Sequence, residues 1–474
     1  MLTDDCVLRR ALDEGGLSEA QLASARTKCS RQGSATVDSS ETIGRLVADG
    51  ALSARQVAQM RADSAEVDQV NVVSTGMLHD SDGPVIRMVN EVIADAIRRR
   101  ASDVHWEPLE KRFRVRCRID GVLVETHEPA QALQKAILSR LKIMANISIA
   151  EKRIPQDGRI QLSHRGRPID LRVSSLPTAH GESVVMRVLD QAALSAGLGD
   201  LGLEPEDRSE LERLIALPDG VVLVTGPTGS GKTSTLYGCL QHLNRSNRKI
   251  ITVEDPVEYQ LNGINQVPVR AGIGLTFAAA LRAMLRQAPN VVMVGEIRDR
   301  ETAEIAVNAS LTGHMVLSTL HTNDAPGAIT RLVDLGIKPF LLAASVRAVI
   351  AQRLVRRICA SCARTHQPSE AELRALDLSP EQLSRASFRT GAGCPGCDGT
   401  GFHGRVGLFE IVVINAELQE MIHARAPAAL LRAKARSLGM RTLREDGARK
   451  VSAGLTTAAE VVSITAGEPS QPTL

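Results

Sequence analysis

Aromatic residues are scarce in this chain of 474 residues, making up 2% of the sequence. Proteins that bind single-stranded nucleic acid commonly stack the bases on aromatic side chains, so this scarcity argues against helicase-like functions without excluding them. The formal net charge of +3 is small for the length and argues against a dedicated polyanionic partner.

Long apolar runs are also missing. The best candidate, 340–350, is interrupted by Arg347 and is shorter than the roughly 18 to 20 residues that span a bilayer. The amino terminus does not have the basic segment followed by an apolar core that marks a secretory signal. We therefore expect a cytoplasmic protein that reaches a membrane only through its partners.

What the sequence does contain is a complete phosphate-binding pattern, G-x-x-x-x-G-K-[ST]. An apolar stretch at 221–225 precedes it and a helical stretch follows, which is the strand–loop–helix context that such loops require. We expect backbone N–H groups to surround the phosphates of ATP, Lys232 to reach the β/γ-phosphates, and the Thr233 hydroxyl to ligate Mg²⁺. The alternative is a glycine-rich turn without a ligand. The predicted nucleotide-binding residues of this segment are Gly226, Pro227, Thr228, Gly229, Ser230, Gly231, Lys232, Thr233 and Ser234.

Hydrolysis also needs carboxylates near the phosphates, and two apolar segments supply them. Both are predicted strands, one ending in Glu254 and the other followed by Glu296. Because ligands bind at the carboxyl ends of parallel strands, we expect Glu296 to hold Mg²⁺ together with Thr233. Glu254 is expected to polarise the attacking water or to hold the hydration shell of the metal. A single Glu after a strand is more often a solvated turn residue, but two such segments downstream of one loop weaken that alternative.

Two histidines flank another apolar stretch, 315–320. A structural role is the simpler expectation for His314, which precedes it. His321 follows the stretch and is predicted to sense the γ-phosphate.

Four of the eight cysteines form two C-x-x-C pairs. Cys359 and Cys362 make the first pair, and Cys394 and Cys397 make the second. Two such pairs hold Zn²⁺ tetrahedrally through four thiolates, which leaves no open position for catalysis. The predicted site is therefore structural zinc, with reduced, unligated thiols as the alternative. The other cysteines are expected to be ordinary small apolar residues.

The chain is long enough for several domains. Residues 1–70 are predicted to form a small helical docking or regulatory module, with a poorly ordered leader as the alternative. An α+β domain is expected at 80–190, a linker rich in Gly and Ala at 191–207, and a C-terminal ATPase domain at 208–474. The last is predicted to have a P-loop (RecA-like) parallel-sheet core, because short apolar strands alternate with helices, and to include the zinc module at 359–397 and a helical tail.

These motifs, in this order, resemble a known family. The loop at 226–233, the Glu-Asp-Pro-Val-Glu segment at 254–258, the Gly-Glu-Ile-Arg-Asp segment at 295–299 and the segment at 312–324 are similar to the Walker A, Asp, Walker B and His boxes of the ATPases that drive type II secretion and type IV pili. Upstream, 101–108, 153–159 and 180–182 resemble the second N-terminal domain of that family. The four-cysteine module favours the assembly branch, GspE- or PilB-like, over the retraction ATPases.

The resemblance implies a Mg²⁺-dependent homo-hexamer whose domains close on ATP. Arg172 and Arg187 match arginines that the N-terminal domain of the family contributes to the phosphates, and Arg282 and Arg286 match arginines on the helix before Walker B; in each case a guanidinium would offset phosphate charge. The implied partners are an inner-membrane platform protein and a membrane-anchored docking protein, and indirectly pilins or pseudopilins. Direct binding of nucleic acid is not expected.

The sequence departs from the family at Ala288 and Asn290, where relatives usually carry aspartates. We expect this loss of carboxylates beside the site to weaken metal organisation or to slow turnover. It keeps open a rival function, a nucleotide-gated scaffold that barely hydrolyses ATP. The other rival is a P-loop motor that moves nucleic acid.

Overall fold

The computed structural model describes residues 83–164, 166–190, 197–378 and 380–466, and before residue 83 only 18, 21–24, 39–49, 51, 52, 57, 71 and 72. Two compact units, 1–192 and 193–474, each have a hydrophobic core of their own. Within the described residues, none of the helices has the length and apolar character needed to span a bilayer.

A small helical cluster represents the predicted N-terminal module. Helix α3 (Ser39–Ala48) buries Ile43 and Leu46, which lie three residues apart and therefore share one helix face. Leu52 and Val57 complete the cluster. Residues 18, 21–24, 49 and 51 of the predicted module at 1–70 are also described, and the others fall outside the described residues.

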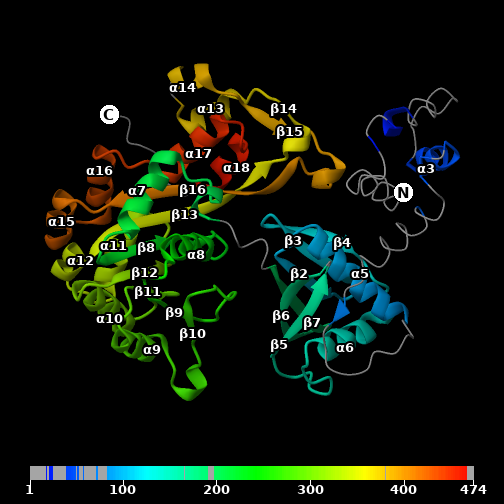
Figure 1. The fold of residues 1–474 in the computed structure, drawn as a ribbon, viewed down its shortest axis with the longest axis horizontal. Helices are drawn as coiled ribbons and strands as arrows, with labels where there is room; N and C mark the ends of the chain where they lie inside the picture. Colours follow the sequence, from blue (N-terminus) through cyan, green and yellow to red (C-terminus); the bar gives the residue numbers. More distant parts are fainter. Residues whose placement is uncertain are drawn as a thin grey trace. The chain divides into compact units, whose positions relative to one another are not determined.

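A seven-stranded antiparallel sheet forms the body of the first unit, in the order β1-β5-β6-β7-β2-β3-β4. Alternate residues of its strands are buried, as along β2 (Asp103–Pro108), so one face packs against helices and the other is polar. Helices α5 (Pro84–Arg98) and α6 (Gln134–Met144) share a core with the buried residues of that face (Figure 1). The other strands are β1 (Asn71–Val72), β3 (Phe113–Ile119), β4 (Val122–His127), β5 (Gln156–His164), β6 (Arg167–Thr178) and β7 (Gly181–Asp190).

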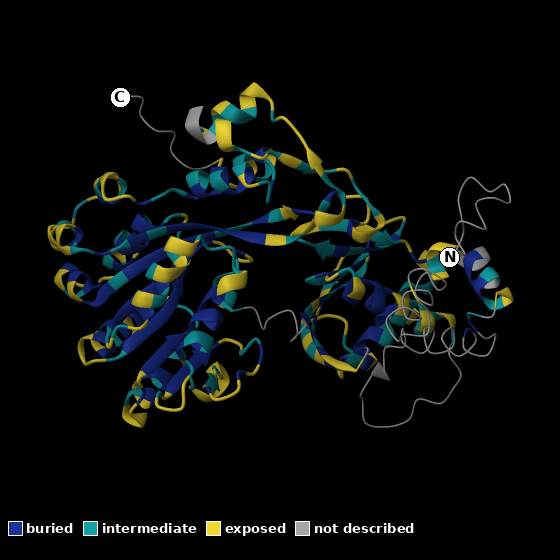
Figure 2. Cartoon of the chain, turned by 45° about the horizontal axis from the view of Figure 1, so that its top comes forward, coloured by how far each residue is buried: buried dark blue, intermediate teal, exposed yellow. Residues whose placement is uncertain are grey.

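A second seven-stranded sheet organises the ATPase unit, in the order β10-β9-β11-β12-β8-β13-β16. Every neighbouring pair is parallel except β13 with β16. The central strands β8, β11 and β12 are buried along their length, as expected of a parallel sheet covered on both faces (Figure 2). The strands are β8 (Gly220–Thr225), β9 (Ile250–Glu254), β10 (Asn265–Pro268), β11 (Val291–Val294), β12 (Met315–Leu320), β13 (Val346–Ile358) and β16 (Phe402–Val413).

Helices cover both faces of this sheet. Side chains of α7 (Pro205–Ile215) and α8 (Lys232–Leu243) belong to the core cluster on one face. The cluster on the other face contains side chains of α9 (Phe277–Met284), α10 (Arg300–Leu311), α11 (Ala325–Asp334), α12 (Pro339–Ser345), α15 (Ala416–His423) and α16 (Ala428–Ser437). This two-sided packing confirms the predicted P-loop architecture.

The cysteine module is inserted between the antiparallel strands β13 and β16. It contains a small sheet of β14 (Ala363–Thr365) and β15 (Arg389–Gly391), with α13 (Glu370–Leu376) and α14 (Pro380–Arg385) between them. The tail helices α17 (Leu443–Ser452) and α18 (Ala458–Ile464) pack against α13 through a shared apolar cluster. The module therefore has its own packing support besides its cysteines.

The second unit begins upstream of residue 208. Leu198, within the predicted linker, is buried against the ATPase core, and α7 begins at Pro205. A composition rich in Gly and Ala suggested a linker here, but Leu198 packs against Gly238 of α8, where the absence of a side chain allows close contact.

Candidate active site

The phosphate-binding loop lies where the sequence predicts it. Strand β8 ends at Thr225 and α8 begins at Lys232, so 226–231 form the turn between them. Residues of β8 enter core clusters on both faces of the sheet, which fixes the strand. The loop is therefore presented at the carboxyl end of a buried strand and beside a helix N-terminus, where backbone N–H groups attract anions.

Space and backbone conformation both require glycine at two positions of the loop. Gly226 and Gly231 have φ angles of 147° and 88°. A β-carbon on Gly226 would lie 2.5 Å from the backbone oxygen of Gln352, and one on Gly231 would lie 2.7 Å from Nε2 of the same residue. Gln352 is buried in β13 and accepts a hydrogen bond of 2.7 Å from the hydroxyl of Thr235. Strand β13 thus packs directly against the loop.

The amine of Lys232 is held over the loop. Its Nζ atom donates to the backbone oxygens of Gly226, at 2.8 Å, and Pro227, at 3.0 Å. Burial lowers the pKa of Lys232 to about 8, with the charge of Glu296 opposing this shift and that of Arg353 adding to it. An ammonium group in this position can exchange carbonyl oxygens for phosphate oxygens, which are stronger partners because they are charged.

Glu296 and His321 meet at the carboxyl ends of neighbouring parallel strands. Glu296 follows β11 and His321 follows β12. Nε2 of His321 lies 3.3 Å from Oε2 of Glu296, and the guanidinium of Arg298 lies 2.6 Å from Oε1. The side chain of Glu296 is 14% exposed and that of His321 is 49% exposed. The carboxylate is thus enclosed, acts electrostatically on Lys232, and contacts a histidine that solvent can reach.

His314 is placed differently. It precedes β12, at the amino end of the strand, where its Nδ1 lies 2.9 Å from the backbone oxygen of Ala309 and 3.2 Å from the hydroxyl of Thr312. These are contacts within its own turn.

The loop carrying His321 is fixed by a set of contacts that no sequence motif indicates. The Thr225 hydroxyl, at the end of β8, accepts from the backbone N–H of Thr322 at 2.8 Å and lies 2.7 Å from the Thr322 hydroxyl. From β13, Arg353 donates to the backbone oxygen of Asn323 at 2.9 Å. Gln352 and Arg353 have no local sequence signal, because 117 residues separate Gln352 from its partner Thr235.

Glu254 ends β9 as predicted, and it is deeply buried, with an exposed fraction of 3%. Its Oε1 accepts from the Thr252 hydroxyl at 2.5 Å and from Nε2 of Gln266 at 3.1 Å. Its Oε2 accepts from the hydroxyl of Tyr237. The carboxylate is therefore held by three donors, a very different environment from that of Glu296.

Arg282 and Arg286 lie on the short helical segment before β11. The guanidinium of Arg282 pairs with Glu301 of α10 at 2.5 Å, and Arg286 donates to the backbone oxygen of Arg282 at 3.0 Å. Both side chains of the Arg282–Glu301 pair are more than half exposed, at 53% and 59%. Such a pair is weak, so it leaves Arg282 able to exchange its partner.

In the first unit, Arg172 and Arg187 are directly opposite each other on β6 and β7. Arg159 of β5 is opposite Arg172 on its other side, so three arginines occupy one row of the sheet. Nε of Arg187 lies 3.4 Å from Oδ1 of Asp103. The row brings three guanidinium groups together, with Arg159 paired to Asp170 and Arg187 to Asp103.

The four cysteines of the two C-x-x-C pairs converge. Their sulfur atoms all lie within 4.8 Å of one another, with Cys359 and Cys394 at 3.8 Å and Cys362 and Cys397 at 3.8 Å. A tetrahedral zinc ion with Zn–S bonds of about 2.3 Å places its sulfurs about 3.8 Å apart, so the geometry fits. Burial opposes ionisation of Cys397, but the backbone N–H groups of Cys394 and Gly401 outweigh it and lower the pKa of this thiol to about 6.

Comparison with known families decides the identity of this arrangement. A family model described as Type II/IV secretion system protein matches residues 79–463. The chain belongs to this secretion-ATPase family. It is 51% identical over 405 residues to Type II secretion system protein E of Pseudomonas aeruginosa, which covers 85% of this chain and 80% of the relative. It is 47% identical over 431 residues to the type IV pilus assembly ATPase PilB of Myxococcus xanthus, covering 90% and 76%.

A solved structure agrees on the fold. The X-ray structure of the Legionella pneumophila ATPase DotB matches with a TM-score of 0.60 and 21% identity, covering 82% of this chain and 98% of that one. The predicted family resemblance and fold class are thus confirmed, and this secretion ATPase is an ATP-hydrolysing enzyme. The relatives do not favour a nucleic-acid motor or a weakly hydrolysing nucleotide-gated scaffold.

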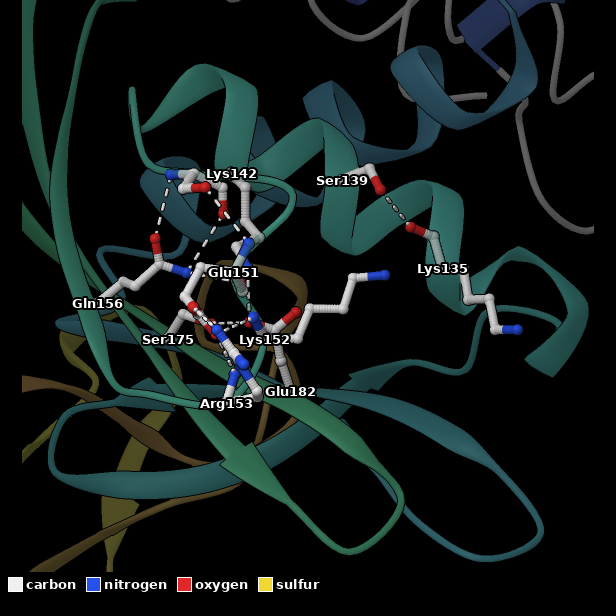
Figure 3. A network of polar contacts seen from close by, with 10 residues as sticks. Lys135, Ser139, Lys142, Glu151, Lys152, Arg153, Gln156, Ser175 and Glu182 are labelled. Carbon is white, nitrogen blue, oxygen red and sulfur yellow. Dashed lines mark hydrogen bonds and ion pairs between the residues drawn. The ribbon is translucent and has the colours of Figure 1, made fainter.

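Two of the three upstream segments that resemble the family's second N-terminal domain, 153–159 and 180–182, are joined in one polar network of this secretion ATPase (Figure 3). Nζ of the buried Lys142 donates to Glu182 and to the backbone oxygen of Glu151, both at 2.6 Å. Nε2 of Gln156 donates to the same backbone oxygen at 2.9 Å. Ser175 of β6 donates to Glu182 at 3.2 Å. The segment before β5 and the start of β7 are therefore fixed to each other.

The missing aspartates of this secretion ATPase were expected beside the metal site, and this placement was wrong. Ala288 and Asn290 precede β11, and the phosphate loop follows the carboxyl end of β8, which runs parallel to β11 in the same sheet. The two positions are thus at the opposite edge of the sheet from the loop. There the side-chain oxygen of Asn290 accepts from the backbone N–H of Lys249 at 2.8 Å, and the backbone N–H of Asn290 donates to the backbone oxygen of Lys249 at 2.8 Å. Ala288 and Asn290 are close in sequence to the Walker B strand β11, which suggested that they lie near the metal. They lie at the amino end of β11, whereas Glu296 follows its carboxyl end.

Proposed function

We propose that this ATPase is a Mg²⁺-dependent homo-hexamer that works in the cytoplasm at the inner membrane and powers the assembly of a pilus or pseudopilus. The observation that carries the proposal is the convergence of the phosphate loop, Glu296 and His321 at one edge of the parallel sheet. Relatives named for type II secretion and for pilus assembly support the proposed role in assembling a pilus or pseudopilus.

Within one chain, the proposed roles follow from position. Lys232 binds the β/γ-phosphates, and Thr233 and Glu296 hold Mg²⁺, which offsets phosphate charge when it is bound. The hydroxyl and the enclosed carboxylate are oxygen ligands of the kind that Mg²⁺ takes. His321 contacts Glu296 and is exposed enough to meet the γ-phosphate. Glu254 polarises the attacking water or holds the hydration shell of the metal.

The remaining nucleotide contacts are proposed to come from arginines. Arg172 and Arg187 of the first unit, and Arg282 and Arg286 of the second, contribute guanidinium groups that offset charge on the transferred phosphoryl group when the units close. Closure would make hydrolysis depend on domain position, which is how an ATPase of this type converts chemistry into movement. The paired side chains Glu301 and Asp103 are the partners that Arg282 and Arg187 give up on closure.

The four-cysteine site is proposed to hold structural zinc. Four thiolates complete a tetrahedral shell and leave no ligand position for substrate. The ion would fasten the two turns of the module that lies between β13 and β16. Because β13 also contacts the phosphate loop through Gln352, a loosened module would disturb the ATPase site as well.

The partners proposed from the family are a platform protein of the inner membrane and a membrane-anchored docking protein. The helical module at 1–70 would bind the docking protein, and pilins or pseudopilins would be reached indirectly. No direct contact with nucleic acid is proposed.

A purified full-length chain tests the catalytic assignment. Lys232→Ala should abolish Mg²⁺-dependent ATP turnover while leaving the thermal melting transitions in place. Arg172→Ala together with Arg187→Ala should lower kcat at least about tenfold, and an alanine variant of the exposed Arg153 on the same unit is the matched control. Normal turnover in Lys232→Ala would reject the site, and stimulation by DNA would favour the nucleic-acid motor.

Metal analysis tests the zinc assignment. We expect about one zinc per chain, and Cys362→Ser should lose it, whereas Cys117→Ala, a buried cysteine outside the cluster, should keep it. Chelation should lower the melting temperature of the second unit. A wild-type chain free of zinc and unaffected by chelators would rule the metal out.

A further inference from the structure

We propose that Tyr237 is a positioning residue for Glu254, with its hydroxyl tying the helix after the phosphate loop to the acidic segment. This inference deepens the proposed function, because it assumes that Glu254 takes part in hydrolysis. Tyr237 lies on α8, the helix that begins with Lys232, and it is not part of any motif recognised in the sequence.

The contact is buried on both sides. Tyr237 is 1% exposed and Glu254 is 3% exposed, and the phenol donates to Oε2 of the carboxylate. Burial, followed by the charge of Glu254 and their hydrogen bond, raises the pKa of Tyr237, so the phenol keeps its proton and remains the donor. A buried phenol needs such a partner, whereas packing alone would be satisfied by phenylalanine.

The other donors to Glu254 come from nearer elements. Thr252 is on the same strand, and Gln266 is on β10, the parallel neighbour of β9. Both therefore hold the carboxylate within its own edge of the sheet. Tyr237 alone among these three donors comes from α8, which begins directly after the phosphate-binding loop. It therefore joins the helix that follows the loop to the Glu254 carboxylate.

The surroundings of the phenol hold it in place. The ring of Tyr259 packs edge-on against that of Tyr237, with ring centroids 4.5 Å apart. Gln266 accepts from the backbone N–H of Leu261 at 2.7 Å and donates to the backbone oxygen of Tyr259 at 3.1 Å, which fixes the segment after the acidic residues. A small displacement of α8 would therefore move the phenol relative to a carboxylate that is otherwise fixed.

Removing the Tyr237 hydroxyl should affect turnover differently if it positions Glu254 than if Tyr237 only packs. Tyr237→Phe keeps the ring and its contact with Tyr259 and removes only the donor. If the hydroxyl positions Glu254, the change should lower kcat about 10- to 100-fold and leave KM for ATP within about twofold, because phosphate binding by the loop is untouched. A purely structural role would lower the melting temperature and weaken ATP binding along with kcat.

The experiment compares steady-state ATPase kinetics, ATP affinity and thermal melting of the full-length wild type with Tyr237→Phe, Glu254→Gln and the double variant. Tyr259→Phe is the matched control, since it removes a hydroxyl from the same ring pair and should keep kcat within about twofold. The double variant should be no slower than Glu254→Gln, because the two residues act as one unit.

The outcomes distinguish the role of Glu254 from the role of Tyr237. Wild-type turnover in Glu254→Gln would reject the role of Glu254 and with it the proposal. An inactive Glu254→Gln combined with wild-type turnover in Tyr237→Phe would reject only the role of Tyr237. Equal losses in Tyr237→Phe and Tyr259→Phe, or losses in kcat matched by losses in ATP affinity and melting temperature, would also overturn it.

Discussion

Lys142 and Glu182 form a buried ion pair at 2.6 Å although 40 residues separate them in the sequence. Lys142 is on α6, and Glu182 is the second residue of β7. The pair fixes the start of the strand that carries Arg187, one of the arginines proposed to reach the phosphates. Burial of both charges makes the pair sensitive to the loss of one partner, because the other is then left without compensation.

We expect Lys142→Met to destabilise the first unit by about 3 to 5 kcal/mol, since it leaves the Glu182 carboxylate buried without its cation. Calorimetric melting of the full-length chain would show this as a lowered transition for that unit. Lys135→Met is the matched control on the same helix, because Lys135 is exposed and its loss should change stability by less than about 0.5 kcal/mol. Equal melting curves for the two variants would show that the pair contributes nothing.

The Glu296–His321 contact gives a second prediction. His321→Ala should lower kcat about 10- to 100-fold, because it removes the group that joins the Walker B carboxylate to the γ-phosphate position. His314→Ala is the control at the other end of β12, where the ring Nδ1 contacts Ala309 and Thr312 of its own turn. Steady-state ATPase assays of both variants decide the matter. A loss with His314→Ala as large as that with His321→Ala would contradict the assignment.

The sequence could predict those site residues whose motif lies in one short segment of the chain. Glu296 and His321 were predictable because each follows an apolar strand, and the ends of parallel strands meet at one edge. The loop glycines were predictable because their pattern is contiguous. The sequence did not predict the roles of Gln352, Arg353 and Tyr237, because these roles depend on contacts with distant segments or on burial.

The failures have physical causes as well. Nothing in the composition of 191–207 distinguishes a linker from a segment whose Leu198 fills the space beside a glycine of α8. The misplacement of Ala288 came from treating sequence proximity to Walker B as proximity to the metal. The direction of β11 decides that question, and direction follows from strand pairing rather than from any single residue.

The lowered pKa of Lys232 predicts a pH dependence of ATP binding. In the folded chain this pKa is about 8, below the ordinary value of 10.5, so Lys232 loses its charge as the pH rises through 8. Phosphate favours the charged amine, so ATP binding near pH 8.5 should take up protons and weaken as the pH rises further. Between about pH 8 and 10.5 the unfolded chain holds more protons, so this residue makes the stability of the nucleotide-free fold rise with pH.

Titration calorimetry in two buffers of different ionisation enthalpy measures this uptake. Lys232→Arg is the matched variant, because its guanidinium stays charged across the range, and any ATP binding that it retains should occur without proton uptake from this position. An observed enthalpy that is the same in both buffers for the wild type would contradict the prediction.

The positions where the chain departs from its relatives allow a prediction about stability and turnover together. Ala288 has φ 50° and ψ 52°, a left-handed conformation that costs an alanine roughly 1 kcal/mol and that glycine adopts freely. Ala288→Gly should therefore raise the stability of the second unit by up to about 1 kcal/mol. Asn290→Asp keeps the side-chain oxygen that accepts from the backbone N–H of Lys249 at 2.8 Å, so it should be tolerated.

Turnover should respond to neither position. Ala288→Asp together with Asn290→Asp restores the carboxylates usual in relatives, but it places them at the amino end of β11, away from the phosphate loop at the carboxyl end of β8. We expect kcat to stay within about twofold of the wild type, because a carboxylate there is too distant to hold Mg²⁺ and solvent screens its charge. ATPase assays at limiting and saturating Mg²⁺ provide the measurement. A several-fold rise in kcat, or a lower Mg²⁺ requirement, would show that these positions communicate with the metal through the strand despite their place at its far end.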